Sequence, residues 1–219
     1  MGKLNRGEVT KLSIRLTSKA REEIETFAKN LNLSKAGVIL FALTKILKEK
    51  PSQNDVLNLQ NKYVLELQNL AVTIKKDLAE EINEINETID LNKNIWVGLL
   101  VSDYFETGQE GNLQEEQTET EPFKIKIETN TELKKKIVEI SDNRYIPLSG
   151  LVSYACLQGP AETLPKYQTN EREVFFTRIP SYIYKEVKRN ADERGISDTF
   201  YMELCLYDAF LGKNKIFDL

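Results

Sequence analysis

The stretch KLSIRLTSKAREEIETFAKNLNLSKAG, residues 11–37, contains two different hydrophobic periods. Its first seven residues alternate between polar and apolar side chains, which is the pattern of a β-strand with one solvent-facing side. From Ala20 onward the apolar residues recur at intervals of three and four, which predicts a helix. The same interval resumes after Ser34 and continues to Leu47, which predicts a second helix. The first fifty residues therefore predict one short strand followed by two helices.

Length and composition describe a globular chain that can bury a core. The 219 residues are 41% hydrophobic, which is enough for one or two ordinary domains. No apolar run approaches the about 18 to 20 residues of a membrane span. The first residues, MGKLNRGE, have neither the apolar core of a signal peptide nor a myristoylation signal. We therefore expect a cytoplasmic protein with no membrane partner.

The absence of histidine weakens every catalytic interpretation. Histidine is the usual general base near neutral pH and a common metal ligand. The chain also has no phosphate-binding loop, dinucleotide-binding glycine motif or nucleophile elbow. Cys156 and Cys205 lie in apolar helical patterns without metal-ligand spacing, which favours buried packing thiols. We expect no enzyme activity, no catalytic residues, no metal and no cofactor.

The strand-helix-helix pattern occurs four times along the chain. A shift of 58 residues places the segment 67–105 onto the first unit without a gap. A third unit begins with FKIKIETNTELKKKIVEI, in which Phe123, Ile125 and Ile127 are the expected inward strand residues. A fourth begins with VFFTRIPSYIYKEVKRNADERGIS at Val174. Four such units would occupy nearly the whole chain.

The first unit resembles a ribbon-helix-helix domain of the Arc and MetJ repressor class, and especially the small plasmid copy-control repressors. The resemblance rests on KLSIRLTSKAREEIE and LNLSKAGVI. The fourth unit also resembles this family in TRIPSYIYKEVKRNADERGIS, whereas the second and third units match mainly in apolar spacing. The resemblance implies a mainly α fold with short β ribbons, in which two strands pair antiparallel and the helices interlock beneath them.

A single unit of this kind needs a partner, because its strand leaves backbone groups unpaired and its helices cannot bury their own apolar faces. Four ribbon-helix-helix units in one chain predict two intramolecular pseudo-dimers. We expect the first and second units to pair within residues 1–105, and the third and fourth within 123–219. Between them, residues 106–122 hold six acidic residues and no basic ones, which predicts a flexible linker. Both a monomer and a homodimer with exchanged first units are consistent with this pattern.

Two shorter connections join the units within each pair. The connection 51–68 keeps a helical apolar spacing at Val56, Leu59, Tyr63 and Leu67, which predicts an ordered helix. The connection 158–172 contains two prolines, which predict a loop.

The resemblance implies that each ribbon enters the DNA major groove with its outward side chains against base edges. Arg and Lys can donate to guanine, Asn can bond adenine, and Ala or Thr can contact the thymine methyl group. The expected base contacts are Lys11, Ser13 and Arg15 in the first unit, Asn69, Ala71 and Thr73 in the second, Lys124 and Lys126 in the third, and Arg178 in the fourth. Glu128, Val174 and Phe176 share the outward positions of the last two strands, and an outward Phe176 is more typical of a protein contact.

The resemblance also implies phosphate binding where the second helix of each unit begins, because free backbone amides and the helix dipole favour an anion there. The expected phosphate contacts are Ser34, Lys35, Asn92 and Lys93. The last two units depart from this pattern. Pro147, Leu148 and Ser149 bring no cation, and Asp198 brings an acid.

Charge is distributed unevenly along the chain. Residues 1–50 carry 11 Lys and Arg against 5 Asp and Glu, although the whole chain has a net charge of −4. We therefore expect specific, salt-sensitive binding of double-stranded DNA by the first units, not a histone-like coat.

The favoured function is that of a transcriptional repressor or of a plasmid replication, partition or conjugation accessory protein. The alternative is a protein-interaction scaffold, antitoxin-like or relaxosome-assembling, in which the third and fourth units bind a protein partner. Exposure of Phe176 in an apolar patch, together with a covered first ribbon, would favour the scaffold. A metal-dependent nuclease is the least favoured interpretation.

Overall fold

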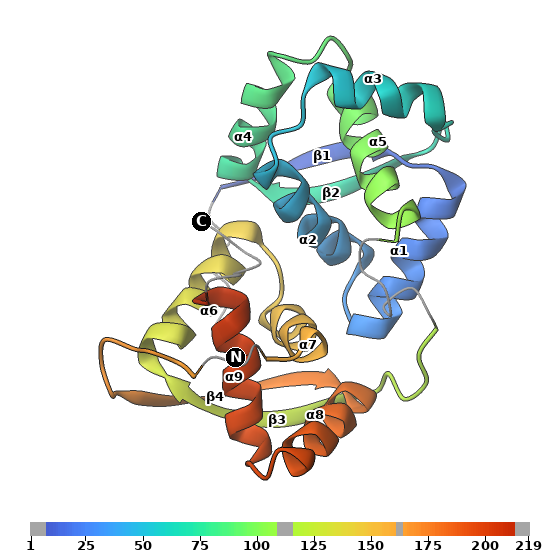
Figure 1. Cartoon of the computed structure of the whole chain (residues 1–219). Helices are drawn as coiled ribbons and strands as arrows, with labels where there is room; N and C mark the ends of the chain where they lie inside the picture. Colours follow the sequence, from blue (N-terminus) through green and yellow to red (C-terminus); the bar gives the residue numbers. More distant parts are fainter. Residues whose placement is uncertain (1–7, 109–115, 161–163, 213–219) are drawn as a thin grey trace. The chain divides into compact units, whose positions relative to one another are not determined.

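The computed structural model of the chain describes residues 8–108, 116–160 and 164–212. In these ranges the protein is mainly helical and has two antiparallel sheets of two strands each (Figure 1). The chain divides into two compact units. The first consists of Met1–Ala28, Leu33–Glu116 and Asp142–Tyr145, and the second of Lys29–Asn32, Gln117–Ser141 and Ile146–Leu219. The expected absence of a signal peptide concerns residues 1–7, which lie outside the described ranges.

Each of the four strands is followed by two helices, as the sequence pattern predicts, and a further helix, α3, lies between α2 and β2. In the first half of the chain, residues 8–108, the elements are β1 (Val9–Arg15), α1 (Ser18–Leu31), α2 (Lys35–Lys48), α3 (Gln53–Lys62), β2 (Asn69–Lys75), α4 (Lys76–Asn86) and α5 (Lys93–Glu106). In the second half, residues 116–212, they are β3 (Pro122–Asn130), α6 (Thr131–Arg144), α7 (Leu148–Gln158), β4 (Arg172–Pro180), α8 (Ser181–Glu193) and α9 (Asp198–Phe210). Among these helices, no single one is both long enough and apolar enough to cross a membrane.

The predicted strand pairing is confirmed in the first half. β1 pairs antiparallel with β2, and Leu12 lies opposite Val72 while Ile14 lies opposite Leu70. The burial of Leu12, Ile14 and Val72 shows that one side of this ribbon faces the core. Helices α5 and α2 supply the cover, since α5 packs against β1 and α2 against β2.

The second half repeats this arrangement with one difference from the expected pattern. β3 pairs antiparallel with β4, with Ile127 opposite Phe175, and both side chains are buried. Phe123, however, was expected to face the core and is 43% exposed. It lies near the beginning of β3, and its ring stacks on Tyr184 of α8 with the centroids 4.6 Å apart. Phe123 therefore packs against Tyr184 instead of against the buried core.

The helices of the first half meet around an aromatic cluster. Phe27 of α1 packs edge to face with Phe105 of α5 at a centroid distance of 5.7 Å. Trp96 of α5 is fully buried, and its indole nitrogen donates a hydrogen bond to Asn86 Oδ1 at 2.8 Å. The buried polar end of the tryptophan is therefore satisfied, which is the usual condition for burying this side chain.

Close packing of α5 on β1 depends on Gly98. A Cβ atom at this position would lie 1.8 Å from the carbonyl oxygen of Arg15, far inside van der Waals contact. Because glycine has no Cβ, the backbone of α5 can contact the backbone of β1 at this position.

A buried carboxylate occupies a comparable strand-facing place in the second half. Glu203 of α9 is 1% exposed and accepts hydrogen bonds from Arg172 Nη2 at 2.8 Å, Tyr167 Oη at 3.1 Å and the Asn130 backbone N–H at 3.2 Å. Burial and the nearby Glu203 charge raise the pKa of Tyr167, so its hydroxyl remains a donor. The network joins α9 to the end of β3 and the beginning of β4.

The two cysteines are free and buried, as predicted. The hydrogen bond with Cys156 and burial both raise the pKa of Cys205 above its ordinary value. A neutral buried thiol is a poor nucleophile, so these residues act as packing groups.

The connections differ from the expectations in their lengths. Helix α3 begins with a capping box between Ser52 and Asp55 and ends at Lys62, after which Tyr63 is extended. The predicted helix over residues 51–68 is therefore too long, because the chain must become extended before it enters β2; Leu67 is 84% exposed. Residues 109–115 of the predicted linker and 161–163 of the predicted loop lie outside the described ranges. Glu106 and Pro122, at the ends of that linker, belong to α5 and β3.

Candidate nucleic-acid interface

The outward face of the β1–β2 ribbon brings together all six base-contact residues expected in the first two units. Antiparallel partners project from the same face of a ribbon, so each cross-strand pair forms one row. The register gives three rows, namely Lys11 with Thr73, Ser13 with Ala71, and Arg15 with Asn69. Arg15 and Thr73 are partly exposed and the other four are exposed.

The chemistry of this face suits hydrogen bonding to base edges. These six residues offer two cations, two hydroxyl groups, one amide and two methyl groups on a two-stranded ribbon, an element that the major groove admits. Neither Lys11 nor Arg15 forms an ion pair with another described residue. The Lys11 side chain is exposed, whereas Arg15 is partly exposed and its Nε is buried.

The beginnings of α2 and α5 differ in their caps. Ser34 caps α2, because its hydroxyl accepts a hydrogen bond from the Gly37 backbone N–H at 3.0 Å. Asn92 occupies the corresponding position before α5, and its side chain makes no capping hydrogen bond. The expected phosphate contact of Asn92 therefore does not compete with a cap.

Both lysines at these helix starts already have a partner within the protein. Lys35 forms an exposed ion pair with Glu25, and Lys93 Nζ donates to Asn83 Oδ1. Glu25 and Asn83 are related by the same 58-residue shift as the two units. A phosphate at α2 would have to compete with a carboxylate for Lys35, whereas at α5 the competitor is a neutral amide. These partners of Lys35 and Lys93 were not predicted from the sequence. The signal that could have revealed them is that Glu25 and Asn83 each lie ten residues before the lysine that they contact.

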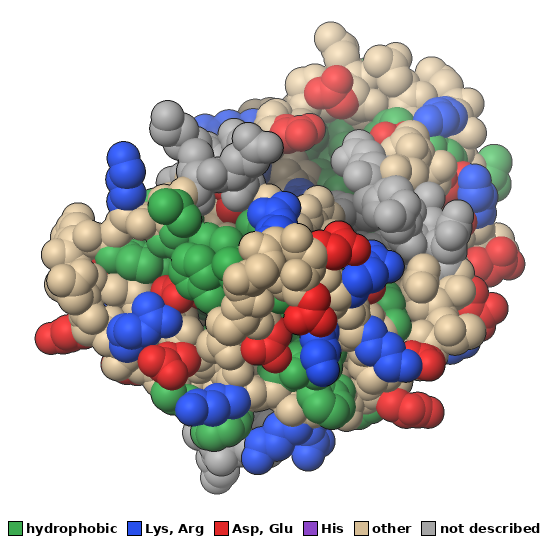
Figure 2. Space-filling view, turned by 60° about the horizontal axis from the view of Figure 1, so that its bottom comes forward, with side chains coloured by type: hydrophobic (Ala, Val, Ile, Leu, Met, Phe, Trp, Pro, Cys, Tyr) green, Lys and Arg blue, Asp and Glu red, His purple; other side chains and the backbone are tan. Residues whose placement is uncertain are grey.

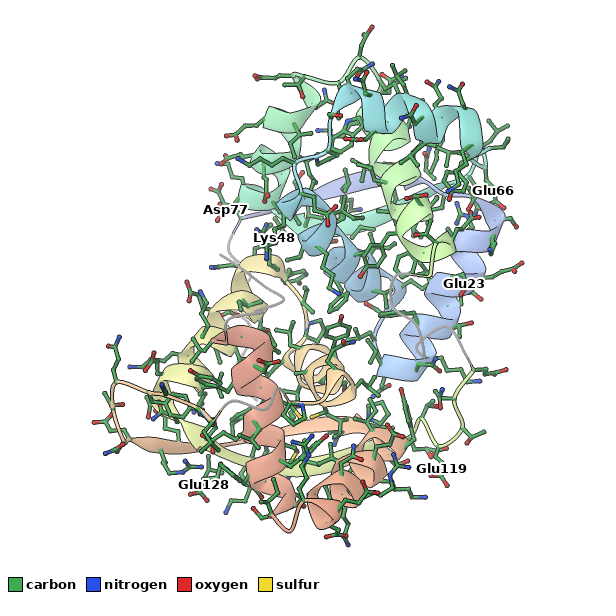
Figure 3. All side chains as sticks on the ribbon, viewed as in Figure 1. Glu23, Lys48, Glu66, Asp77, Glu119 and Glu128 are labelled. Carbon is green, nitrogen blue, oxygen red and sulfur yellow. The ribbon has the colours of Figure 1, made fainter. Side chains whose placement is uncertain are left out.

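The outward face of the β3–β4 ribbon has a different composition. Lys124 lies opposite Arg178, Lys126 opposite Phe176, and Glu128 opposite Val174. Lys124 Nζ sits 5.0 Å from the centroid of the Phe176 ring. Glu128, marked on the second ribbon in Figure 3, forms an ion pair with Arg172 at 3.4 Å. The three expected base contacts of the second half thus share one face, but they surround an exposed aromatic ring.

The helix starts of the second half offer little to a phosphate. Pro147 precedes α7 without any side-chain cap. Ser197 caps α9 by accepting from the Phe200 N–H at 3.2 Å, but Asp198 follows in the first turn. Asp198 accepts a hydrogen bond from the Tyr184 hydroxyl at 2.8 Å, and this raises the pKa of Tyr184. A carboxylate at this place repels an anion.

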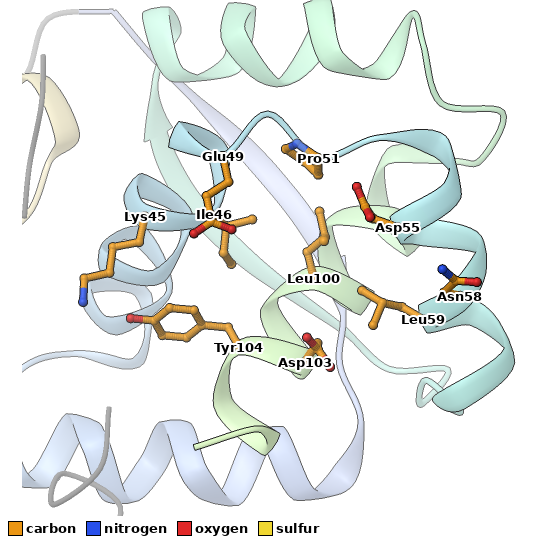
Figure 4. Close-up of a pocket in the computed structure, with 10 residues that line it drawn as sticks. All are labelled: Lys45, Ile46, Glu49, Pro51, Asp55, Asn58, Leu59, Leu100, Asp103 and Tyr104. Atoms are coloured by element: carbon orange, nitrogen blue, oxygen red, sulfur yellow. The ribbon is translucent and has the colours of Figure 1, made fainter. Parts of the chain in front are cut away.

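A pocket of about 390 Å³ lies away from the ribbon, between α2, α3 and α5 (Figure 4). Asp103 at its edge already accepts from Lys62 Nζ at 2.9 Å and Tyr63 Oη at 2.8 Å, and Asp55 accepts from Ser52. Its three carboxylates make it unsuitable for nucleic acid. The residues lining it are Lys45, Ile46, Glu49, Pro51, Asp55, Asn58, Leu59, Leu100, Asp103 and Tyr104.

The described residues contain no group of three or more acidic or cysteine side chains placed to hold a metal ion. On the face shown in Figure 2, lysines and arginines are interspersed with acidic side chains. Attraction of an anionic ligand to this face would therefore be local. Comparison with protein-family models, with curated proteins and with solved structures finds no match to this chain.

Proposed function

We propose that this chain is a sequence-specific DNA-binding protein built from four ribbon-helix-helix units. The units would form two intramolecular pseudo-dimers, and the β1–β2 ribbon would enter the major groove. The observation that carries this proposal is the register of β1 and β2, which gathers the six side chains expected to contact bases on one outward face.

Each row of this face has a chemical counterpart in the major groove. Lys11 and Arg15 can donate to guanine O6 and N7, and Asn69 can bond the Hoogsteen edge of adenine. Ala71 and the methyl group of Thr73 can contact thymine methyl groups, while Ser13 can donate or accept. The beginnings of α2 and α5 would hold the flanking phosphates through Ser34, Lys35, Asn92 and Lys93.

The family resemblance supports the biological role of a transcriptional repressor or of a plasmid replication, partition or conjugation accessory protein. Because β1 and β2 pair within one chain, a monomer with internal pseudo-dimers is the simpler functional state.

The test begins with selection of bound duplexes from a random DNA pool at low salt. Against the selected site, Arg15→Ala should cost about 1 to 3 kcal/mol of binding free energy and relax the preference at one base pair, because a base-edge contact favours the right sequence over wrong ones. Lys48→Ala, an exposed cation at the other end of α2 from Ser34, is the matched control and should leave the affinity unchanged. Retention of full affinity by the double variant Lys11→Ala with Arg15→Ala would contradict the proposal.

One observation favours the second candidate, a protein-interaction scaffold. Phe176 is 60% exposed on the outward face of the second ribbon. The first ribbon is also exposed, however, so only one of the two conditions for that interpretation is met. The two candidate functions therefore fall on different halves of the chain.

A further inference from the structure

The outward face of the β3–β4 ribbon places two cations side by side without neutralising them. Lys124 and Arg178 are direct cross-strand neighbours, and both are exposed. Like charges at such positions destabilise a ribbon. Neither forms an ion pair with a described residue, and the same is true of Lys126. This arrangement leaves three unneutralised positive charges on one short ribbon.

Exposed apolar surface lies among these charges. Phe176 is 60% exposed and Val174, two residues before it on the same face, is 42% exposed. Lys126 flanks the Phe176 ring across the ribbon, and Lys124 lies over the ring at 5.0 Å. Aromatic residues and arginine are enriched at the centre of protein interfaces, where they are surrounded by polar contacts.

Several features of this ribbon argue against a second DNA-reading face. Its three exposed outward rows contain no amide and no hydroxyl group, unlike the rows of the first ribbon, and the amide of Asn130 in the next row is buried and donates to the Thr169 carbonyl. Its one acceptor, Glu128, is held by Arg172. The helix starts of this half carry Pro147 and Asp198 where a phosphate would need a cap or a cation.

We propose that the outward face of the β3–β4 ribbon docks an acidic segment of a partner protein. The carboxylates of that segment pair with Lys124, Lys126 and Arg178, and at least one apolar side chain covers Phe176 and Val174. Charge complementarity selects an acidic occupant, and the exposed ring selects one that also carries apolar residues. This docking does not depend on DNA binding by the first ribbon.

The test uses short random peptides displayed on phage and selected against the immobilised full-length chain. The expected enriched sequences combine Asp or Glu with Leu, Phe or another large apolar residue. An enriched peptide, synthesised with a fluorescent label, should bind about tenfold more weakly to Phe176→Ser and to Arg178→Gln, which corresponds to about 1.4 kcal/mol each. Leu67→Ser and Arg189→Gln change an exposed leucine and an exposed arginine elsewhere, so they should leave peptide affinity unchanged.

Three outcomes would overturn the proposal. Enriched peptides without acidic residues, or peptides whose affinity is the same on wild type, Phe176→Ser and Arg178→Gln, would show that this face is not the docking surface. Loss of affinity for selected DNA in the variant Lys124→Gln with Lys126→Gln would make the ribbon a second DNA reader. A dimer in light scattering that Phe176→Ser converts to monomer would identify a second copy as the occupant. Failure of DNA binding by the first ribbon would leave the peptide selection, the peptide affinities and the light scattering unaffected.

Discussion

The two ribbons of this protein have similar apolar inward faces and different outward faces. On the inside, Leu12, Ile14 and Val72 of the first ribbon and Ile125 and Ile127 of the second are all buried. On the outside, the first ribbon carries alternating hydrogen-bonding groups, whereas the second carries cations around an exposed aromatic ring. The inner face is fixed by the need to bury apolar surface beneath paired strands. The outer face is free of that requirement, so its composition can differ between the two ribbons.

The helices that cover the ribbons show a second difference. Gly98 brings the α5 backbone against Arg15 of β1, while Glu203 of α9 meets the end of β3 through a hydrogen-bonded carboxylate. In the first half, helix and strand come into contact because Gly98 has no side chain. In the second half, they come into contact through the buried Glu203 carboxylate and its hydrogen-bond donors. The second solution requires a complete set of donors, because a buried carboxylate without partners is strongly destabilising.

The sharpest test of this difference is Gly98→Ala. Alanine favours a helix over glycine by about 1 kcal/mol, but the added Cβ would lie 1.8 Å from the Arg15 carbonyl oxygen. We expect the clash to outweigh the helix preference and to lower the free energy of unfolding by about 3 kcal/mol or more. The measurement is chemical denaturation followed by circular dichroism.

Gly195→Ala in the second half is the matched control. Gly195 has a φ of +66° and no atom within 4 Å of a built Cβ, so only backbone strain of about 1 kcal/mol is expected. If Gly98→Ala costs no more than Gly195→Ala, α5 does not approach β1 as closely as the structure shows.

Features with a regular period could be predicted from the sequence, and features that depend on one contact could not. The alternation from Lys11 to Thr17 predicted a strand, and its repetition 58 residues later predicted the pairing with β2. The outward rows followed from the same alternation, since side chains alternate between faces with a period of two.

The remaining features lack such a signal. The exposure of Phe123 depends on Tyr184, a residue of α8 far along the chain. The pairing of Lys35 with Glu25 is an exposed ion pair, which carries no hydrophobic pattern. Gly98 interrupts an apolar helical run. Such a glycine indicates close packing, but the sequence does not show which residue it packs against.

A smaller effect distinguishes the two helix starts of the first half. Ser34→Ala removes the hydrogen bond from the Gly37 N–H and should cost about 1 kcal/mol of unfolding free energy. Asn92→Ala removes no capping bond and should cost at most a few tenths of a kcal/mol. Equal losses in thermal or chemical denaturation would mean that the two starts are alike. If Asn92→Ala changes the free energy of DNA binding more than the free energy of unfolding, the Asn92 amide contacts a phosphate and does not stabilise the helix.

The smallest expected effect concerns the competition between Glu25 and a phosphate for Lys35. Both side chains of this ion pair are more than half exposed, so the pair itself contributes at most about 1 kcal/mol to stability. Glu25→Gln should release Lys35 and remove a negative charge from the expected phosphate site. We therefore expect the affinity for the selected DNA to rise about two- to fivefold at low salt, with little change in melting temperature.

The reciprocal change belongs in the second unit. Asn83→Asp places a carboxylate at the position that Glu25 occupies in the first unit. This carboxylate should hold Lys93 and weaken DNA binding by a similar factor.

Lys35→Ala should reduce the slope of log affinity against log salt by about one, which corresponds to the loss of one phosphate contact. In the double variant of Glu25→Gln with Lys35→Ala, the gain from Glu25→Gln should shrink, because the lysine it would release is gone. An undiminished gain would show that Glu25 acts by long-range repulsion alone and that α2 does not bind a phosphate through Lys35.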